Sequence, residues 1–138
     1  MQALKLIMGV KGSGKTKQFI ELVNHALKDE KGNIICVERG GHLTYDLPHD
    51  VRLIESTDYD FPGYDFLKGF ITGLRSGNYD VTHIFFDSVL KIIGREYGPE
   101  AEAFFDWVND FGATHGLRFT MMVTSDAALA GESVKKYF

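Results

Sequence analysis

Short apolar runs alternate along the chain with longer stretches in which apolar residues recur at helical spacing. The short runs predict five β-strands, at residues 3–8, 33–38, 51–56, 82–87 and 117–124. The longer stretches predict helices at residues 15–28, 62–76, 88–95 and 99–115, with a short helical tail at 126–138. Strands that alternate with helices in this way are typical of an α/β domain with a mostly parallel sheet.

Each longer helix is predicted to turn one apolar face toward the sheet. The expected inward residues are Phe19, Ile20, Val23 and Leu27 in the first helix, Tyr64, Leu67, Phe70, Ile71 and Leu74 in the second, and Ala101, Phe104, Phe105, Val108 and Phe111 in the last. The run "THIFFD" at 82–87 is apolar up to its final acid, as expected for a central strand that is covered on both faces.

The connection between the second and third predicted strands leaves the topology open. Residues 39–50, "RGGHLTYDLPHD", are too polar and too broken to predict a helix. Their length lies at the lower limit for a parallel crossover, which takes a dozen or so residues. The strands at 33–38 and 51–56 are therefore expected to pair either in parallel or as an antiparallel hairpin at the edge of the sheet.

Composition and charge narrow the class of protein. At 138 residues the chain is most simply one domain, residues 1–138, with an ordinary share of hydrophobic residues, 44%. The net charge of −4, with acids and bases mixed along the chain, argues against nucleic-acid binding. No apolar run is long enough to predict a membrane span. The only cysteine, Cys36, predicts a buried thiol in a reducing compartment, so a cytoplasmic protein is expected.

The segment "GVKGSGKT", residues 9–16, joins the first predicted strand to the first predicted helix and fits the Walker A pattern G-x-x-x-x-G-K-[ST]. Glycines let successive backbone N–H groups point into one cavity, and the following helix adds the positive end of its dipole. Lys15 is expected to reach the β- and γ-phosphates of ATP as a catalytic cation, and the Thr16 hydroxyl is expected to bind Mg²⁺. The residues predicted to bind the nucleotide are Gly9, Lys11, Gly12, Ser13, Gly14, Lys15, Thr16 and Lys17.

Two acids at strand ends are candidates for the rest of such a site. Asp87 is predicted to join the Mg²⁺ shell, because parallel strands end at the same edge of a sheet. Its alternative role is to cap the helix at 88–95. Glu38 is the candidate for activating water, since the position after Asp87, where many ATPases carry Glu, is Ser88. The alternative for Glu38 is a solvated acid without a catalytic role.

Several other polar residues lie near the expected ligand edge. Thr124 and Ser125 can contact the γ-phosphate or its water, or else cap the final helix. Arg39 is the nearest of the arginines, although none is a clear arginine finger. His42 and Tyr45 can stack on a base, while packing within their loop is the simpler interpretation. The five histidines show no metal-ligand spacing and are expected to be exposed or hydrogen-bonded.

With these segments in view, the chain resembles a family of small bacterial P-loop proteins, often catalogued as ATP-binding or as twitching-motility-ATPase-like. The similarity lies in "LIMGVKGSGKTKQFIELVNHAL", "TYDLPHDVRLIESTDY", "IFFDSVLKII" and "LRFTMMVTSD…VKKYF". The segment "AALAGES" departs from the family, in which a Pro-containing acidic turn is usual. The resemblance implies a three-layer P-loop NTPase-like fold and ATP binding, with a physiological role that is unknown for the family.

Three functions are compatible with these features. The first is a Mg²⁺-dependent ATPase, which is expected to be slow or stimulated by a protein partner because no Glu follows Asp87. The second is a binding module that responds to nucleotide without useful catalysis. The third is a small-molecule kinase, for which residues 39–50 are the only long candidate for a lid. A GTPase is not expected because the chain has no N-K-x-D motif, and the single cysteine argues against a thymidine kinase with its zinc lobe.

Overall fold

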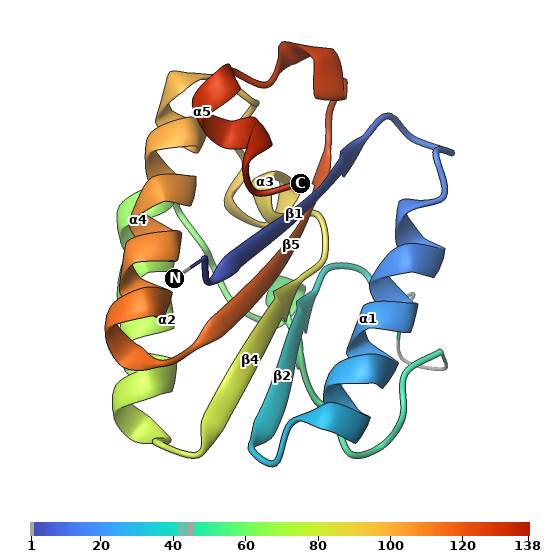
Figure 1. Ribbon diagram of the computed structural model, residues 1–138, viewed down its shortest axis with the longest axis vertical. Coiled ribbons are helices and arrows are strands. Elements are labelled where there is room, and N and C mark those ends of the chain that lie inside the picture. The colour runs from blue at the N-terminus through green and yellow to red at the C-terminus, as the bar shows by residue number, and fades with distance from the viewer. Residues whose placement is uncertain (1, 42, 44–45) are drawn as a thin grey trace.

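The computed structural model describes residues 2–41, 43 and 46–138, and Figure 1 shows them as an α/β fold. The strands in these residues are β1 (Leu4–Gly9), β2 (Asn33–Glu38), β3 (Arg52–Glu55), β4 (Val81–Phe86) and β5 (Arg118–Thr124). They form one sheet in the order β1-β5-β4-β2-β3, and each neighbouring pair is parallel. The prediction of an α/β domain with a five-stranded, mostly parallel sheet is therefore confirmed, and the sheet is parallel throughout.

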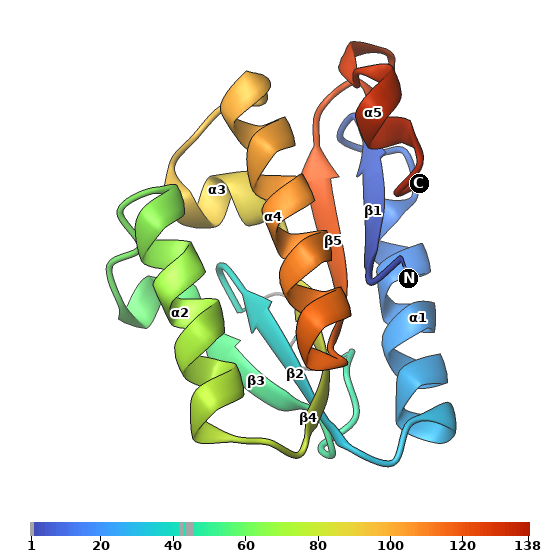
Figure 2. The same ribbon diagram turned by 60° about the vertical axis from the view of Figure 1, so that its left-hand side comes forward.

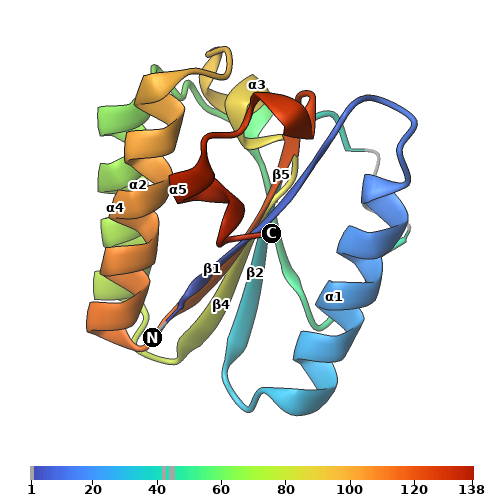
Figure 3. The same ribbon diagram turned by 45° about the horizontal axis from the view of Figure 1, so that its top comes forward.

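Helices cover both faces of this sheet. They are α1 (Lys15–Asp29), α2 (Tyr64–Gly77), α3 (Val89–Ile93), α4 (Pro99–His115) and α5 (Glu132–Lys135), with 3₁₀ turns at Ser56–Asp58 and Ala127–Leu129. Figure 3 shows α1 on one face and α2 with α4 on the other, which makes three layers. The expected helical tail is the second 3₁₀ turn followed by α5. None of the helices in the described residues is both long enough and apolar enough to cross a bilayer.

The core is divided by the sheet into two parts. Side chains alternate along β2, so that Ile34 and Cys36 pack with Phe19 of α1, while Ile35 and Val37 belong to the larger cluster under α2 and α4. Cys36 is fully buried, as predicted. The predicted inward residues that are buried are Phe19, Val23, Leu67, Ile71, Ala101, Phe104, Phe105 and Val108, and the remaining ones are partly buried against the same clusters.

The connection that the sequence leaves open is a parallel crossover. Ile35 pairs with Arg52 and Val37 pairs with Ile54, so β3 runs in the same direction as β2. The antiparallel hairpin is therefore wrong. Residues 39–51 supply enough chain to return to the opposite end of the sheet without a helix. In the described part of this segment, the amides of Asp46 and Leu47 both donate to the carbonyl of Leu43.

The position of β5 brings three strand ends together. β5 lies between β1 and β4, with Thr124 opposite Gly9 and Met121 opposite Phe86. Figure 2 shows the parallel arrows of β1 and β5 side by side, with α3 near their C-terminal ends. The loop that leaves β1 and the turn that leaves β4 therefore share one edge of the sheet, which is where ligands of open α/β sheets bind.

The last residues of the chain cover part of the outer edge of β1. The amide of Leu6 donates to the carbonyl of Tyr137 at 2.7 Å, and the Tyr137 hydroxyl donates to Asp106 Oδ1 at 2.6 Å. Tyr137 and Val134 are both buried. Because an open strand edge is a template for pairing with another chain, this contact protects the sheet as well as anchoring the tail.

Candidate phosphate-binding site

The loop between β1 and α1 has the backbone geometry that the glycine pattern predicts. Gly12 and Gly14 adopt φ angles of 84° and 85°, which belong to the left-handed region that favours glycine. Gly14 is the residue before the first turn of α1. The Ser13 amide donates to the carbonyl of Val10 at 3.2 Å, which closes the loop on itself. The first free N–H groups of a 15-residue helix therefore stand at the C-terminal edge of the sheet.

Gly9 is required by a close approach within this loop. A Cβ atom placed on Gly9 would lie 2.5 Å from the Ser13 hydroxyl oxygen and 3.4 Å from its Cβ. The Ser13 side chain therefore occupies the space that any other residue at position 9 would need. These two predicted residues shape the loop from within.

A pocket of about 440 Å³ opens beside the loop. The predicted residues Lys11, Gly12, Gly14, Lys15, Thr16 and Lys17 line it from the loop side, and Ser88, Lys91, Met122 and Thr124 line it from the strand ends. The structure thus brings most of the predicted nucleotide-binding residues to one concave surface. The opposite wall is built from the end of β5 and from α3 and the turn before it.

Lys15 is held over the loop with little exposure to solvent. Its side chain reaches back so that Nζ donates to the carbonyl of Val10 at 2.8 Å, and the residue is only 9% exposed. Burial lowers the pKa of Lys15, the charge of Lys91 lowers it further, and the carboxylate of Asp87 acts in the opposite direction. An anion bound at this position would raise the pKa of Lys15 back toward its ordinary value.

Asp87 is the first residue after β4 and is buried beside this pocket. Its amide donates to the carbonyl of Val37 at 2.9 Å, and its Oδ1 accepts from the Ser88 hydroxyl at 3.1 Å. Asp87 is not the N-cap residue of α3, because Ser88 occupies that position, where no side-chain capping bond is formed. Ser88 has a φ of 50°, an uncommon value for a residue with a side chain. Such strain is found at functional turns.

Glu38 lies at the end of β2, one strand farther from the loop than β4. It is buried, and its Oε2 accepts from the amide of Leu43 at 3.0 Å. The structure therefore places Glu38 under the 39–50 segment, and it is not among the described residues that line the pocket. Arg39 is exposed and also does not line the pocket, and His42 and Tyr45 lie outside the described residues.

The end of β5 contributes to the site in a way that the sequence left open. Thr124 lines the pocket, and the Ser125 amide donates to the carbonyl of Gly9 at 3.1 Å, which ties β5 to the start of the loop. Neither residue caps the final helices. Asp126 caps the 3₁₀ turn through its contact with the Ala128 amide, and Gly131 is the residue before α5. Asp126 therefore fills the capping role that the sequence left open for Thr124 and Ser125.

Lys91 is the residue of this pocket that the sequence analysis missed. It is the only exposed residue of α3, a helix whose other residues are buried aliphatics. The sequence shows one charged residue inside "VLKII", but the direction of its side chain depends on how the short helix packs. The sequence alone does not predict how this helix is rotated about its axis.

Fold and loop together define a class, a three-layer α/β domain with a Walker A pattern at the end of its first strand. In comparisons with known proteins, no family model matches the chain. No curated protein matches it either.

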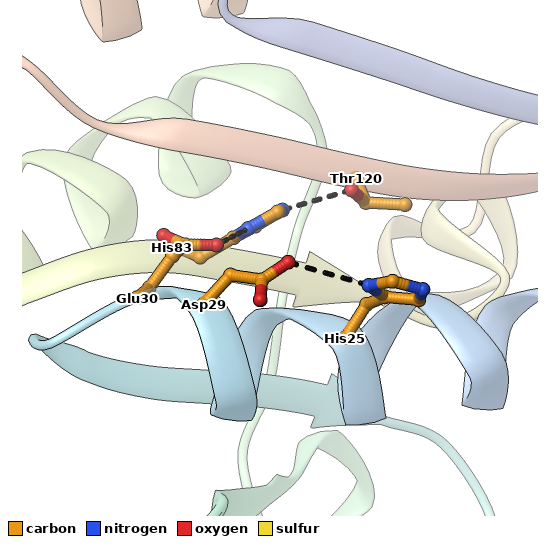
Figure 4. A network of polar contacts seen from close by, with 5 residues as sticks. All are labelled: His25, Asp29, Glu30, His83 and Thr120. Atoms are coloured by element: carbon orange, nitrogen blue, oxygen red, sulfur yellow. Dashed lines mark hydrogen bonds and ion pairs between the residues drawn. The ribbon is translucent and has the colours of Figure 1, made fainter.

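A second polar cluster lies toward the opposite end of the sheet, beside a larger cavity of about 530 Å³. Figure 4 shows His83 between Glu30 and Thr120, with His83 Nδ1 2.7 Å from Glu30 Oε2 and His83 Nε2 2.9 Å from Thr120 Oγ1. The imidazole stacks on Phe85 with ring centroids 4.1 Å apart. His25 and Asp29 form an exposed pair nearby. The expectation of a hydrogen-bonded histidine is confirmed for His83.

This cluster has the order acid, imidazole, hydroxyl, but its hydroxyl-bearing residue is almost fully buried. Thr120 lines the cavity yet is only 2% exposed, within β5, an interior strand of the sheet. Burial raises the pKa of Glu30, but the hydrogen bond and charge of His83 outweigh it and hold that pKa below its ordinary value. We interpret the cluster as a structural connection between α1, β4 and β5.

Proposed function

We propose that the chain binds ATP with Mg²⁺ in the pocket beside the loop and hydrolyses it slowly. The observation that carries this proposal is the charge of the pocket wall. Four lysines line it, Lys11, Lys15, Lys17 and Lys91, and none of the described lining residues has a carboxylate. In a chain with a net charge of −4, such a concentration of positive charge favours a polyanion.

The backbone supports the same ligand. The left-handed glycines allow the loop to curve around a phosphate, and the N-terminus of α1 adds partial positive charge from its unpaired N–H groups. Lys15 can transfer its hydrogen bond from the Val10 carbonyl to a phosphate oxygen with only a small movement of the side chain. A nucleotide triphosphate supplies a chain of phosphates of the length that this loop can follow.

The residues present fit Mg²⁺ as the accompanying ion. Thr16 lines the pocket and Asp87 directly follows β4, which ends at the same edge of the sheet, so both would supply the hard oxygen ligands that Mg²⁺ prefers. Among the described residues, no group of three or more His, Cys, Asp or Glu could hold a metal ion. This accords with Mg²⁺, which takes one or two protein oxygens together with phosphates and water. When bound, the ion would neutralise charge on the β- and γ-phosphates.

Hydrolysis requires a water oxygen to form a bond with the γ-phosphorus. The bond from that phosphorus to the bridging oxygen breaks, its electron pair leaves with ADP, and a proton of the water passes to phosphate or solvent. The described wall of the pocket provides cations and hydroxyls for the transferred group but no carboxylate to orient the water. We therefore propose slow turnover, which a protein partner would raise by supplying the missing group.

A second candidate function is favoured by the same missing carboxylate. A domain that binds ATP but does not activate water can act as a nucleotide-responsive binding module. In that case, the protein partner would distinguish the nucleotide-bound chain from the free chain. The two functions share the ligand and differ in whether phosphate is released.

Thermal unfolding with Mg²⁺ and nucleotide tests ATP binding, which both candidate functions require. At a ligand concentration 100-fold above its dissociation constant, ATP should stabilise the fold by about 2.7 kcal/mol, or roughly 5–10 °C in melting temperature. Lys15→Ala should remove the shift, and inorganic phosphate and GTP test whether the site needs a triphosphate and adenine. An unchanged melting temperature up to millimolar ATP would refute the proposed ligand.

Release of phosphate separates the two functions. Steady release of phosphate that Lys15→Ala abolishes supports the ATPase. Tight ATP binding without any release supports the binding module, which is then tested by asking whether ATP changes the proteins that the chain retains.

A further inference from the structure

The short helix α3 holds one charged side chain in a fixed direction. Val89, Leu90, Ile92 and Ile93 are all buried, and Lys91 alone is exposed. A five-residue helix with four buried residues cannot rotate without exposing one of them, so the direction of Lys91 is set by the core. The strained turn at Ser88, with its φ of 50°, fixes where the helix starts.

Lys91 stands where two pockets meet. It lines the phosphate pocket together with Lys15 and Thr16, and it also lines a neighbouring pocket of about 340 Å³ with Arg95 and Tyr97. Ser88 and Thr124 are shared by both pockets as well. Lys91 is therefore placed across the pocket from the glycine loop.

The two ammonium groups act on each other. The charge of Lys91 is one of the causes that lower the pKa of Lys15. No ion pair or side-chain hydrogen bond joins Lys91 to another residue in the part of the chain that the structure describes. The carboxylate of Asp87 acts on Lys15 in the opposite direction. Two cations that line one pocket still favour an anion that binds between them.

We propose that Lys91 contacts the terminal phosphate of ATP from the side opposite the loop and makes the site prefer the triphosphate to the diphosphate. This inference rests on the proposed function. The loop and Lys15 hold the phosphates that ATP and ADP share, whereas Lys91 approaches from the strand ends, beside Thr124. In the reaction, its charge would stabilise the γ-phosphate oxygens while the bond to the bridging oxygen breaks.

Lys91 would then supply from within the chain the charge that an arginine finger supplies elsewhere. Arg39 is the arginine that the sequence places nearest the ligand edge, but it does not line the pocket. The cation at the terminal phosphate is therefore assigned to a lysine on α3 that follows Asp87 by four positions.

Binding constants for MgATP and MgADP, measured by calorimetry on the full chain, test this assignment. Loss of a hydrogen bond to a charged phosphate corresponds to about a tenfold weakening. Lys91→Ala and Lys91→Gln should therefore weaken ATP binding about tenfold and change ADP binding less than about twofold. Lys91→Arg should keep most of the preference. Both truncations alter an exposed side chain and leave the buried residues of α3 in place.

Lys28→Ala is the matched control, because it removes the same charge from an exposed position in the last turn of α1. At 1.5 Å per residue, Lys28 lies about 20 Å along the helix from Lys15. It should change neither constant. Equal weakening of ATP and ADP by Lys91→Ala, or no weakening of either, would overturn the role of Lys91 while the nucleotide site stands. A wild-type chain that binds neither nucleotide would overturn the site and this inference together.

Discussion

The ammonium of Lys15 donates to the carbonyl of Val10, 2.8 Å away and within the same loop. The lysine is thus folded over the loop, and the Val10 carbonyl also accepts from the Ser13 amide. This contact keeps a nearly buried charge hydrogen-bonded when no anion is present, and it costs the fold little to exchange it for a phosphate oxygen. Lys15 is therefore expected to contribute little to stability and much to binding.

Lys15→Met should separate those effects. The substitution removes one hydrogen bond but also removes a charge that burial disfavours, so the free energy of unfolding should change by less than about 1 kcal/mol. ATP binding should weaken about 10- to 100-fold, because a charged contact to phosphate is lost. Urea unfolding and calorimetry measure the two quantities. A large loss of stability without loss of binding would show that Lys15 serves the fold alone.

Two glycine-to-alanine substitutions in helices should have opposite signs. At Gly112 in α4, a Cβ would lie 2.4 Å from the Leu117 carbonyl oxygen and 2.7 Å from the Ala3 Cβ. Gly112→Ala should destabilise the fold by about 1–3 kcal/mol, because the backbone or the helix must shift. Gly69 in α2 has nothing within 4 Å of that position, so Gly69→Ala should stabilise by up to about 1 kcal/mol. Chemical denaturation compares them, and equal effects would contradict the close packing of α4.

Acid should remove a contribution to stability that depends on Glu30. The pKa of Glu30 is below its ordinary value of 4.5 in the folded chain, so the unfolded chain takes up the proton first as the pH falls. The contribution is therefore complete above pH 4.5 and is lost as the pH falls through the folded pKa. Unfolding measured from neutral to acid pH should show a difference between wild type and Glu30→Gln that shrinks on acidification.

Glu21→Gln provides the control for this titration, because Glu21 is an exposed acid in α1, the helix that Glu30 directly follows. It should follow the wild-type pH profile. If Glu30→Gln follows it too, the hydrogen bond between Glu30 and His83 does not contribute to stability.

Among the residues of the C-terminal tail, Tyr137 should make one of the largest contributions to the free energy of unfolding. Tyr137→Ala empties a buried site and should cost about 3–5 kcal/mol, whereas Tyr137→Phe loses only the hydrogen bond to Asp106, about 1 kcal/mol. Tyr59, which is 65% exposed, is the control, and Tyr59→Ala should stay within about 0.5 kcal/mol. If Tyr137→Ala does not lower the free energy of unfolding, other contacts hold the tail against the edge of β1.

The sequence predicts the elements and the loop well because both depend on local patterns. Strands and helices follow the period of the apolar residues. The glycines of the loop predict a tightly curved backbone, and Gly12 and Gly14 do adopt the left-handed conformation. The placement of Asp87 after β4 also follows, since an apolar run that ends in an acid marks a strand end. These predictions need no knowledge of which strands are neighbours.

Other features depend on tertiary packing and are not in the local pattern. The pairing of β2 with β3 depends on how residues 39–51 return, and the place of β5 between β1 and β4 is a choice of strand order. The direction of the Lys91 side chain also depends on tertiary packing, because the core under α3 sets it. Likewise, the contact of His83 with Glu30 joins residues 53 positions apart.

The insertion of β5 has a consequence for a chain that is made from its N-terminus. Thr124 and the strand that carries it are synthesised more than a hundred residues after the glycine loop. A nascent chain that carries only the loop cannot yet form the opposite wall of the pocket. Binding at the proposed nucleotide site would therefore require a polypeptide whose sheet is already assembled, and a prematurely terminated product would lack that site.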